Sequence, residues 1–452
     1  MTVTVYPQRT GAVAQWSDST GSSLTQPNGT VRGIPDGSYL RSPPPATIKR
    51  FTDQIGVTIN NSGTAATVTV DASAPCGRTA LKVAMPAGNT YTEISLASIG
   101  LAAFDDHLVW RVWVEDYTAV NQINSYAGTT AYGRYYQDAH IISTSSDYRW
   151  NGEHPVVTGP TRASAISTFV AGTDTLDAAK LRILPGAGGA NVWIDCVSVV
   201  PRGVGIVLLT YDDGYRSWID YVLPDLAAYG LVATFGVQTN IVGTNHSLYV
   251  DSADIPTMIS AGHEVVPHQV SNTRFNDGLI GTQTVSEYQT DFRTAAATMR
   301  GYSRACRTTF HPFVQGGMNQ SLVDALRAEG VRIARGVTMK KHNFHRAGLG
   351  RSVLNLRTQS MGSDTASLAA MLAEVDNCAK YGSTFVIMGH DFSPGATPAS
   401  TLWSTENHTA VCSAINAYIK TGRIIAMRAS DYAQMVYQQR LVEQSLLTDW
   451  PV

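Results

Sequence analysis

The stretch Ile206-Val207-Leu208-Leu209-Thr210-Tyr211-Asp212-Asp213-Gly214 decides the fold of the second half of this chain. A short run of apolar residues that ends in turn residues is typical of a buried strand in a parallel sheet. Two adjacent carboxylates and a glycine close the run, at the end of the strand where α/β folds place their active sites. The stretch therefore predicts a buried strand with two acidic side chains at its carboxyl end.

The chain after this strand alternates between apolar strands and amphipathic helices. We expect a helix over 217–229 that stops at Gly230, and another over 364–381 with Asp364 as N-cap and Gly382 as C-cap. Further strands are expected at 232–237, 264–267, 308–310, 331–335, 384–388 and 424–427. Seven strand–helix units in a row favour a distorted (β/α) barrel, complete or incomplete, over residues 202–452.

The chain before residue 202 has a different pattern. Over residues 48–201, short β-like runs alternate with turn residues and no long amphipathic helix interrupts them. This pattern predicts an all-β sandwich, jelly-roll-like, which we interpret as a carbohydrate-binding or spacer module. Trp110, Trp113 and Trp193 are candidates for a sugar platform, but strand alternation puts Trp110 and Trp113 on opposite faces, so one of them should be core.

Residues 1–47 are rich in Ser, Thr, Gly and Pro and end in the triple proline Pro43-Pro44-Pro45, which predicts an attachment segment and a stiff linker. The N-terminus lacks the basic start and apolar core of a signal peptide, and no apolar run is long enough to cross a bilayer. The five cysteines are scattered without the spacing of a zinc or redox motif, which predicts free, mostly buried thiols and a reducing compartment for folding.

Composition argues against a nucleic-acid partner. Charged residues make up 15% of the 452 residues and the formal net charge is −2. No cluster of Lys and Arg stands out, so binding to nucleic acid or to an anionic membrane has no electrostatic support.

Polar side chains follow several of the expected strands. Asp212 and Asp213 close the first strand, His268 the third, His311 the fourth, and His390 with Asp391 the sixth. The carboxyl ends of strands in a barrel meet on one face, so these side chains should lie close together. Adjacent carboxylates and histidines suit a metal ion combined with general acid–base chemistry, because one carboxylate can bind a cation while the other takes a proton from water.

These residues resemble the polysaccharide deacetylases of the NodB homology type. The family's first motif, Thr-Phe-Asp-Asp-Gly, is similar to Thr210–Gly214, and its second, Gly-His-Glu-Ile-Gly-Asn-His-Thr-x-x-His, is similar to Gly262–Asn272. A Pro-aromatic turn corresponds to His311-Pro312-Phe313, and an apolar run ending in His-Asp corresponds to Phe385–Asp391. The order and spacing of the motifs fit over residues 203–433.

The resemblance implies a hydrolase that removes acetyl groups from a polysaccharide with the help of zinc or a related divalent ion. It implies that Asp212 is the general base, Asp213 and His268 are metal ligands, and His390 is the general acid with Asp391 beside it. A backbone N–H near Phe313 or Val314 is expected to share the oxyanion.

Two positions depart from the family pattern. The family's second histidine ligand falls at Asn272, whose amide oxygen is a weaker ligand for zinc than imidazole. Either Asn272 binds through its carbonyl oxygen, or a group such as Asp277 replaces it, or the affinity for metal is low. The family's third-motif arginine, which orients the base, is replaced by His311, and the family's fourth motif has no clear match.

A sugar-active enzyme without an export signal suggests release by lysis, and a bacteriophage tail spike or fibre, as a homotrimer, fits this context. Its substrate would be an acetylated polysaccharide of a bacterial surface. Two alternatives keep the fold but change the function: a catalytically silent receptor-binding tail protein, and a metal-independent amidohydrolase. Asn272 is the residue that keeps both alternatives open.

Overall fold

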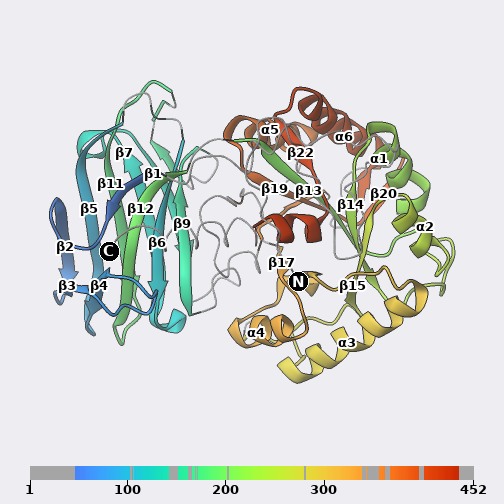
Figure 1. Cartoon of the computed structure of the whole chain (residues 1–452), viewed down its shortest axis with the longest axis horizontal. Coiled ribbons are helices and arrows are strands. Elements are labelled where there is room, and N and C mark those ends of the chain that lie inside the picture. Colours follow the sequence, from blue (N-terminus) through green and yellow to red (C-terminus); the bar gives the residue numbers. More distant parts are fainter. Residues whose placement is uncertain are drawn as a thin grey trace, which may run out of the picture.

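A computed structural model gives the structure of the chain (Figure 1). It describes residues 46–101, 104, 106–141, 151–160, 165–167, 169–170, 172–200, 203–278, 281–337, 343, 356–361, 367–396 and 402–436. The proposed attachment segment and its triple proline lie outside these residues, Ala46 and Thr47 excepted.

The first part of the described chain consists of two six-stranded antiparallel sheets that pack against each other. One sheet has the order β3-β4-β12-β6-β9 with β1 also paired to β12, and the other has the order β10-β8-β7-β11-β5-β2. The β-rich region expected from the sequence is confirmed. Its strands are β1 (Ala46–Arg50), β2 (Val57–Gly63), β3 (Thr67–Asp71), β4 (Ala80–Met85), β5 (Asn89–Leu101), β6 (His107–Val114), β7 (Val120–Gly128), β8 (Tyr135–Ile141), β9 (Gly152–Thr158), β10 (Ala165–Ser167), β11 (Leu176–Pro185) and β12 (Ala190–Val200).

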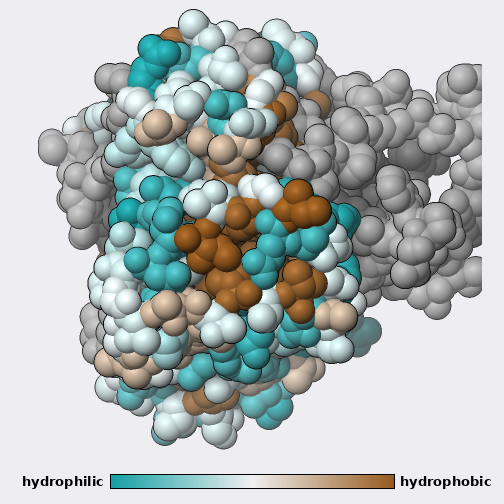
Figure 2. Space-filling view, turned by 90° about the vertical axis from the view of Figure 1, so that its left-hand side faces the viewer, coloured by the Kyte–Doolittle hydropathy of each residue, from teal (hydrophilic) through white to brown (hydrophobic). Residues whose placement is uncertain are grey.

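The sandwich core lies between the two sheets and is built from alternate residues of each strand. Trp110 is fully buried there and stacks on Phe51, with ring centroids 6.0 Å apart, so it is a core residue. Trp113 and Trp193 contact a smaller cluster on the opposite face of the same sheet. Figure 2 shows an apolar patch on the side of the molecule where β2 and β3 lie. On and beside these strands Val70 is 40% exposed and Ile55 78% exposed.

The second part of the chain is a parallel α/β structure, on the right in Figure 1. Its main sheet has the order β15-β14-β13-β19-β18, and β22 also pairs with β13. A two-stranded sheet, β16-β17, continues beyond β15 without a described ladder to it, so the described residues form no closed barrel. All seven expected strands are present. The strands are β13 (Gly205–Asp213), β14 (Ala233–Gln238), β15 (Glu264–Gln269), β16 (Phe310–Pro312), β17 (Ile333–Arg335), β18 (Gln359–Ser360), β19 (Thr384–Gly389), β20 (Asp391–Ser393), β21 (Leu402–Ser404) and β22 (Ile424–Ala426).

Six α-helices of the described chain belong to this second part: α1 (Leu223–Tyr229), α2 (Asp254–Ser260), α3 (Val285–Tyr302), α4 (Gln320–Ala328), α5 (Leu368–Tyr381) and α6 (Thr405–Lys420). α1 and α5 end at Gly230 and Gly382, both in the left-handed region, as predicted. The predicted N-cap Asp364 is wrong. The hydroxyl of Ser367, directly before the first helical residue, accepts the N–H of Ala370 at 3.2 Å and caps α5 instead.

Side chains alternate between the two faces of β13, and this alternation positions the later chemistry. Val207, Leu209 and Tyr211 pack against the helices in one core. Ile206 and Leu208 face a second, inner core with residues of β15, β16 and β17. Because side chains alternate along a strand, Asp212 belongs to the inner face.

None of the helices in the described part of the chain is long and apolar enough to cross a membrane. All five cysteines are free thiols, four of them buried and Cys76 half-buried, as the scattered spacing predicted.

Candidate active site

The acidic pair lies where β13 ends, beside the carboxyl ends of β14 and β15. In the parallel pairing of β13 with β14, Asp212 lies opposite Gly236 and Asp213 opposite Val237. Asp213 adopts φ 84°, a left-handed conformation that is uncommon for residues other than glycine. Residues with such a strained backbone cluster at functional sites, where the surrounding structure holds them in that conformation.

Asp212 is buried and forms an ion pair with the fully buried guanidinium of Arg335 on β17. Arg335 also donates from Nε to the hydroxyl of Thr210 at 3.1 Å. Burial by itself would raise the pKa of Asp212, but the charge of Arg335, aided by the neighbouring His268 and His390, outweighs it and holds the pKa below its usual value. Oδ1 of Asp212 has no hydrogen-bond partner among the described residues, so one oxygen of an ionised carboxylate is available to accept a proton.

Asp213 and His268 face each other. Nδ1 of His268 donates a hydrogen bond to the carbonyl oxygen of Pro312 at 3.0 Å, because a carbonyl can only accept. In the neutral ring, a hydrogen on Nδ1 leaves the lone pair on Nε2. Nε2 lies 3.5 Å from Oδ1 of Asp213 and 3.9 Å from Oδ2 of Asp212. The histidine therefore turns a ligand atom toward the acidic pair.

His390 follows β19 and is held through its backbone. The indole Nε1 of Trp218, in a π-helical turn at Trp218–Val222, donates to the carbonyl oxygen of His390 at 2.6 Å. Burial lowers the pKa of His390, and the carboxylates of Asp212 and Asp213 partly oppose that shift. Nδ1 of His390 has no hydrogen-bond partner among the described residues. The ring therefore lies close enough to the acidic pair for both carboxylates to act on its pKa, and one of its nitrogens has no described partner.

Three other predicted site residues are placed differently. Asp391 is half-buried and accepts the hydroxyl of Ser217 at 2.7 Å and its neighbour's N–H at 2.9 Å. His311 points away from the inner face, toward α3, where it contacts the hydroxyl of Tyr288 at 2.9 Å. Asn272 is exposed in the loop after β15. Their proposed roles in catalysis and metal binding stay predictions.

The expected oxyanion donors and the expected substitute ligand all have other partners in the structure. The backbone N–H of Phe313 donates to the carbonyl oxygen of Arg335 at 3.0 Å, and that of Val314 donates to the Tyr288 hydroxyl at 3.4 Å. Neither N–H is free to bind an oxyanion, so that expectation is wrong for this conformation. Asp277, considered as a substitute ligand, forms an ion pair with Arg274 at 2.7 Å.

Sequence reasoning missed two residues of the site, Arg335 and Gln238. Gln238 is buried at the end of β14, and its Nε2 donates to Oδ1 of Asp213 at 2.5 Å. Each carboxylate of the pair thus has its own buried partner: a cation for Asp212 and a neutral amide for Asp213. Both partners stand at the carboxyl end of a strand that the sequence predicts, so the strand-end rule, applied to every strand, would have found them.

Residues 200–334 match the sequence model of the polysaccharide deacetylase family. We call residues 203–436 the deacetylase-like domain. No curated protein matches the chain.

Three solved structures are among those to which the chain is similar. A family 4 acetyl xylan esterase from Clostridium thermocellum, in complex with a cobalt ion, is 18% identical, with a TM-score of 0.35, over 50% of this chain and 89% of that one. The peptidoglycan deacetylase PdaC of Bacillus subtilis is 18% identical, with a TM-score of 0.35, over 55% and 98%. The pseudoenzyme BA3943 of Bacillus anthracis is 12% identical, with a TM-score of 0.36, over 51% and 66%.

The donor set of the deacetylase-like domain fits a divalent cation. A carboxylate oxygen of Asp213 on β13 and Nε2 of His268 on β15 face each other across β14, and imidazole with carboxylate is a common ligand set for zinc and related ions. The bond from His268 to Pro312 is the kind of supporting contact that metal-bound histidines have. Asp213 and His268 are therefore the residues that would hold the ion.

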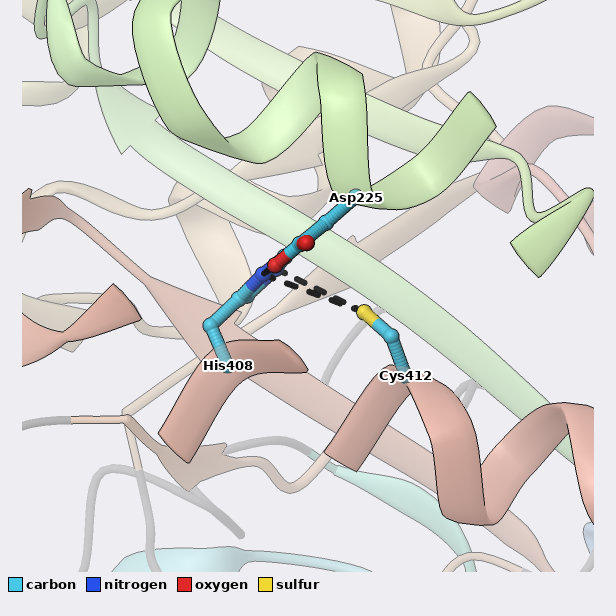
Figure 3. Close-up of side chains that lie close together, drawn as sticks. All are labelled: Asp225, His408 and Cys412. Carbon is cyan, nitrogen blue, oxygen red and sulfur yellow. Dashed lines mark hydrogen bonds and ion pairs between the residues drawn. The ribbon is translucent and has the colours of Figure 1, made fainter. Parts of the chain in front are cut away.

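A second group of ligand-type side chains, Asp225, His408 and Cys412, lies on the helix side of β13 (Figure 3). Both nitrogens of His408 are already engaged, with Asp225 at 2.6 Å and the hydroxyl of Tyr211 at 2.7 Å. Sγ of Cys412 lies 3.8 and 3.7 Å from the two nitrogens, which is far from the outward line of either lone pair. The group is better described as a hydrogen-bond network that ties β13 to α1 and α6.

Gly236 offers a test of how tightly the site is built. A Cβ there would lie 2.9 Å from Cγ of Pro312, 3.3 Å from Oδ1 of Asp212 and 3.4 Å from Cβ of His268. Gly236→Ala should therefore shift Pro312 and crowd the Asp212 carboxylate, and lower the hydrolytic rate by less than the roughly 10²-fold that a 1 Å misplacement can cost. Gly301→Ala is the matched control, because nothing lies within 4 Å of its Cβ. Equal activity of the two variants would show that the inner face can accommodate an extra methyl group at position 236.

His311 should make stability depend on pH. Burial lowers its pKa from 6.5 to about 3, so the unfolded chain takes up a proton first and stability falls as the pH drops from about 6.5 toward 3. At pH 4 the loss from this residue is about 3 kcal/mol. Urea unfolding at pH 7 and pH 4 should show a smaller difference for His311→Gln than for the wild type. The exposed His246 provides the control His246→Gln, and a wild-type-like difference in both variants would contradict the assignment.

Proposed function

We propose that the deacetylase-like domain is a metal-dependent hydrolase that removes acetyl groups from a polysaccharide. The observation that carries the proposal is the arrangement of two carboxylates with separate environments. Asp212 is ionised beside Arg335, and Asp213 faces the free nitrogen of His268. Such a pair suits one carboxylate for proton transfer and the other for binding a cation.

The residues of the chain divide the reaction between them. Asp213 and His268 would hold the ion, which when bound polarises the acetyl carbonyl. Asp212 takes the proton of the attacking water through its unpartnered Oδ1, and Arg335 holds the carboxylate in its ionised form. His390 protonates the departing amine or alcohol, and the Trp218 bond to its carbonyl fixes where the ring stands.

Acetate release tests this proposal. Purified protein should liberate acetate from a panel of N- and O-acetylated glycans, lose the activity with a chelator, and regain it with zinc or another divalent ion. Release that survives complete removal of metal would favour a metal-independent amidohydrolase. A protein that binds glycan but releases no acetate under any metal would favour the catalytically silent receptor-binding protein.

His390→Ala should separate substrates by their leaving groups. An amine leaves only with a proton, so loss of the acid should lower the rate on an N-acetyl substrate by about 10²–10⁴-fold. An activated ester needs no proton on its leaving group, and its rate should change much less. Steady-state kinetics on both substrates give the comparison. Equal losses on the two substrates would mean that His390 is structural.

The sandwich is proposed to bind the glycan. Support comes from Tyr126, Tyr132 and Tyr135, with neighbouring ring centroids 5.9–6.5 Å apart, and from Lys180, whose Nζ lies 4.5 Å from the Tyr126 ring. Aromatic rings with polar neighbours suit the mixed surface of sugars. Tyr135→Ala should weaken binding to the polymer and leave hydrolysis of a small acetylated sugar unchanged. Unaltered binding to the polymer would argue for a spacer.

The wider context is also a proposal. The Ser/Thr-rich residues 1–47 and the neighbouring sandwich are compatible with a virion tail protein that acts on a bacterial surface polysaccharide after lysis. We propose that this protein assembles as a homotrimer. Sedimentation should give a trimeric mass for the full chain and a smaller mass when residues 1–47 are removed. A monomeric full chain would weaken the tail assignment.

A further inference from the structure

We propose that Gln238, through its amide oxygen, is the third protein ligand of the metal site, in the place that the family pattern gives to Asn272. The inference rests on the proposed function, which assigns Asp213 and His268 to the same ion. It goes further by naming the residue that completes the site and the kind of ion that the site prefers.

The three side chains come from three adjacent strands and meet at one atom. Oδ1 of Asp213 on β13 accepts Nε2 of Gln238 at 2.5 Å and lies 3.5 Å from Nε2 of His268. β14, which carries Gln238, lies between β13 and β15. Gln238 is only 6% exposed, so its side-chain amide is buried at this site and away from solvent. An ion held between Asp213 and His268 would therefore lie beside the Gln238 amide.

Gln238 can turn an oxygen toward an ion without moving its backbone. A half-turn of the amide group exchanges its oxygen and nitrogen in nearly the same positions. In the structure the nitrogen faces the Asp213 carboxylate. With an ion, the oxygen is the better partner, because a carbonyl oxygen is an accepted ligand for divalent cations.

The other candidates are less well placed. Asn272 is exposed in the loop after β15. Asp277 is engaged by Arg274 at 2.7 Å. Gln238, by contrast, donates directly to Asp213.

An amide in place of a second imidazole also changes the choice of ion. Oxygen ligands favour harder cations such as Mn²⁺ and Mg²⁺, while imidazole favours zinc. The site should therefore show a smaller preference for zinc over manganese than one with two histidines. Gln238→His should increase that preference.

Calorimetric titration of chelator-treated full-length protein with Zn²⁺ and with Mn²⁺ tests the inference without any activity assay. Gln238→Ala should weaken binding by about tenfold or more, in the range seen for loss of a supporting or ligating group. Gln238→Glu should strengthen binding, because a carboxylate is a better ligand than an amide. Asn272→Ala is the control and should bind as the wild type does.

Gln238→Glu separates a ligand from a residue that only orients Asp213. If the amide serves only to donate its N–H, the new carboxylate repels Asp213 and binding weakens, which would overturn the inference. It would also be overturned if Gln238→Ala bound as the wild type or if Asn272→Ala lost as much. Thermal unfolding confirms that each variant is folded, and Gln238→Met replaces the alanine variant if that one is not. A wild-type protein that binds neither ion rejects the metal-dependent function as well, which distinguishes the two failures.

Discussion

Asp212→Asn is expected to abolish most of the hydrolytic rate while the bound metal stays in place. The asparagine keeps the shape of the side chain but cannot take a proton from water, and general bases contribute about 10²–10⁴-fold. Asp213 and His268, which would hold the ion, are unchanged. The measurements are kcat/KM for acetate release and metal content of the purified variant.

The variant also leaves Arg335 without its anionic partner, so stability must be measured alongside the rate. Asp174→Asn is a matched control in the sandwich, because Asp174 is a buried carboxylate paired with Arg134. That control should lose stability and keep its activity. A loss of less than tenfold in the rate of Asp212→Asn would exclude Asp212 as the base, and a loss of metal would move it into the ligand set.

Arg335→Met is expected to have a large effect on both stability and rate. The substitution leaves the Asp212 carboxylate buried without a counter-charge, and breaking a buried pair in this way typically costs about 3–5 kcal/mol. The carboxylate can escape that cost by taking up a proton, which removes it as a base. Urea unfolding gives the loss of stability, and acetate release gives the loss of rate.

The double variant Asp212→Asn/Arg335→Met should be less destabilised than the sum of the single variants. A neutral asparagine beside methionine leaves no buried charge to desolvate, so much of the penalty disappears. Arg335→Lys should fall between the wild type and Arg335→Met, because it keeps the charge but loses the guanidinium fork. Additive losses in the double variant would show that Asp212 and Arg335 act independently.

Much of the local structure follows from the sequence. The run Ile206–Leu209 had to be part of a buried strand, because its side chains are apolar on both faces. The glycines Gly230 and Gly382 end their helices, because a left-handed residue there costs a glycine little. The start of α5 could not be read, because several Ser, Thr and Asp residues there are equivalent caps and only the packed helix selects Ser367.

The sequence likewise identifies some residues of the candidate site and misplaces others. Asp212, Asp213, His268 and His390 could be named from the sequence, because each follows a predicted strand and the carboxyl ends of parallel strands meet. Asp391 and His311 were named by the same rule, and their side chains turn to Ser217 and Tyr288 instead. The sequence shows that a residue lies at the end of a strand. It does not show toward which face of the sheet the side chain points, because that depends on the register of the strand.

What the sequence by itself determined is the order of strands and helices and the chemical groups at the strand ends, since these depend on residues close together in the chain. Which groups become partners was decided only by the tertiary structure. Arg335 reaches Asp212 across 123 positions of sequence, while His311, at the position where the related family has its arginine, turns outward to α3. The physical reason is that a buried charge is paired by whatever cation the packed strands bring within reach, and that choice depends on how strands far apart in the chain are placed side by side.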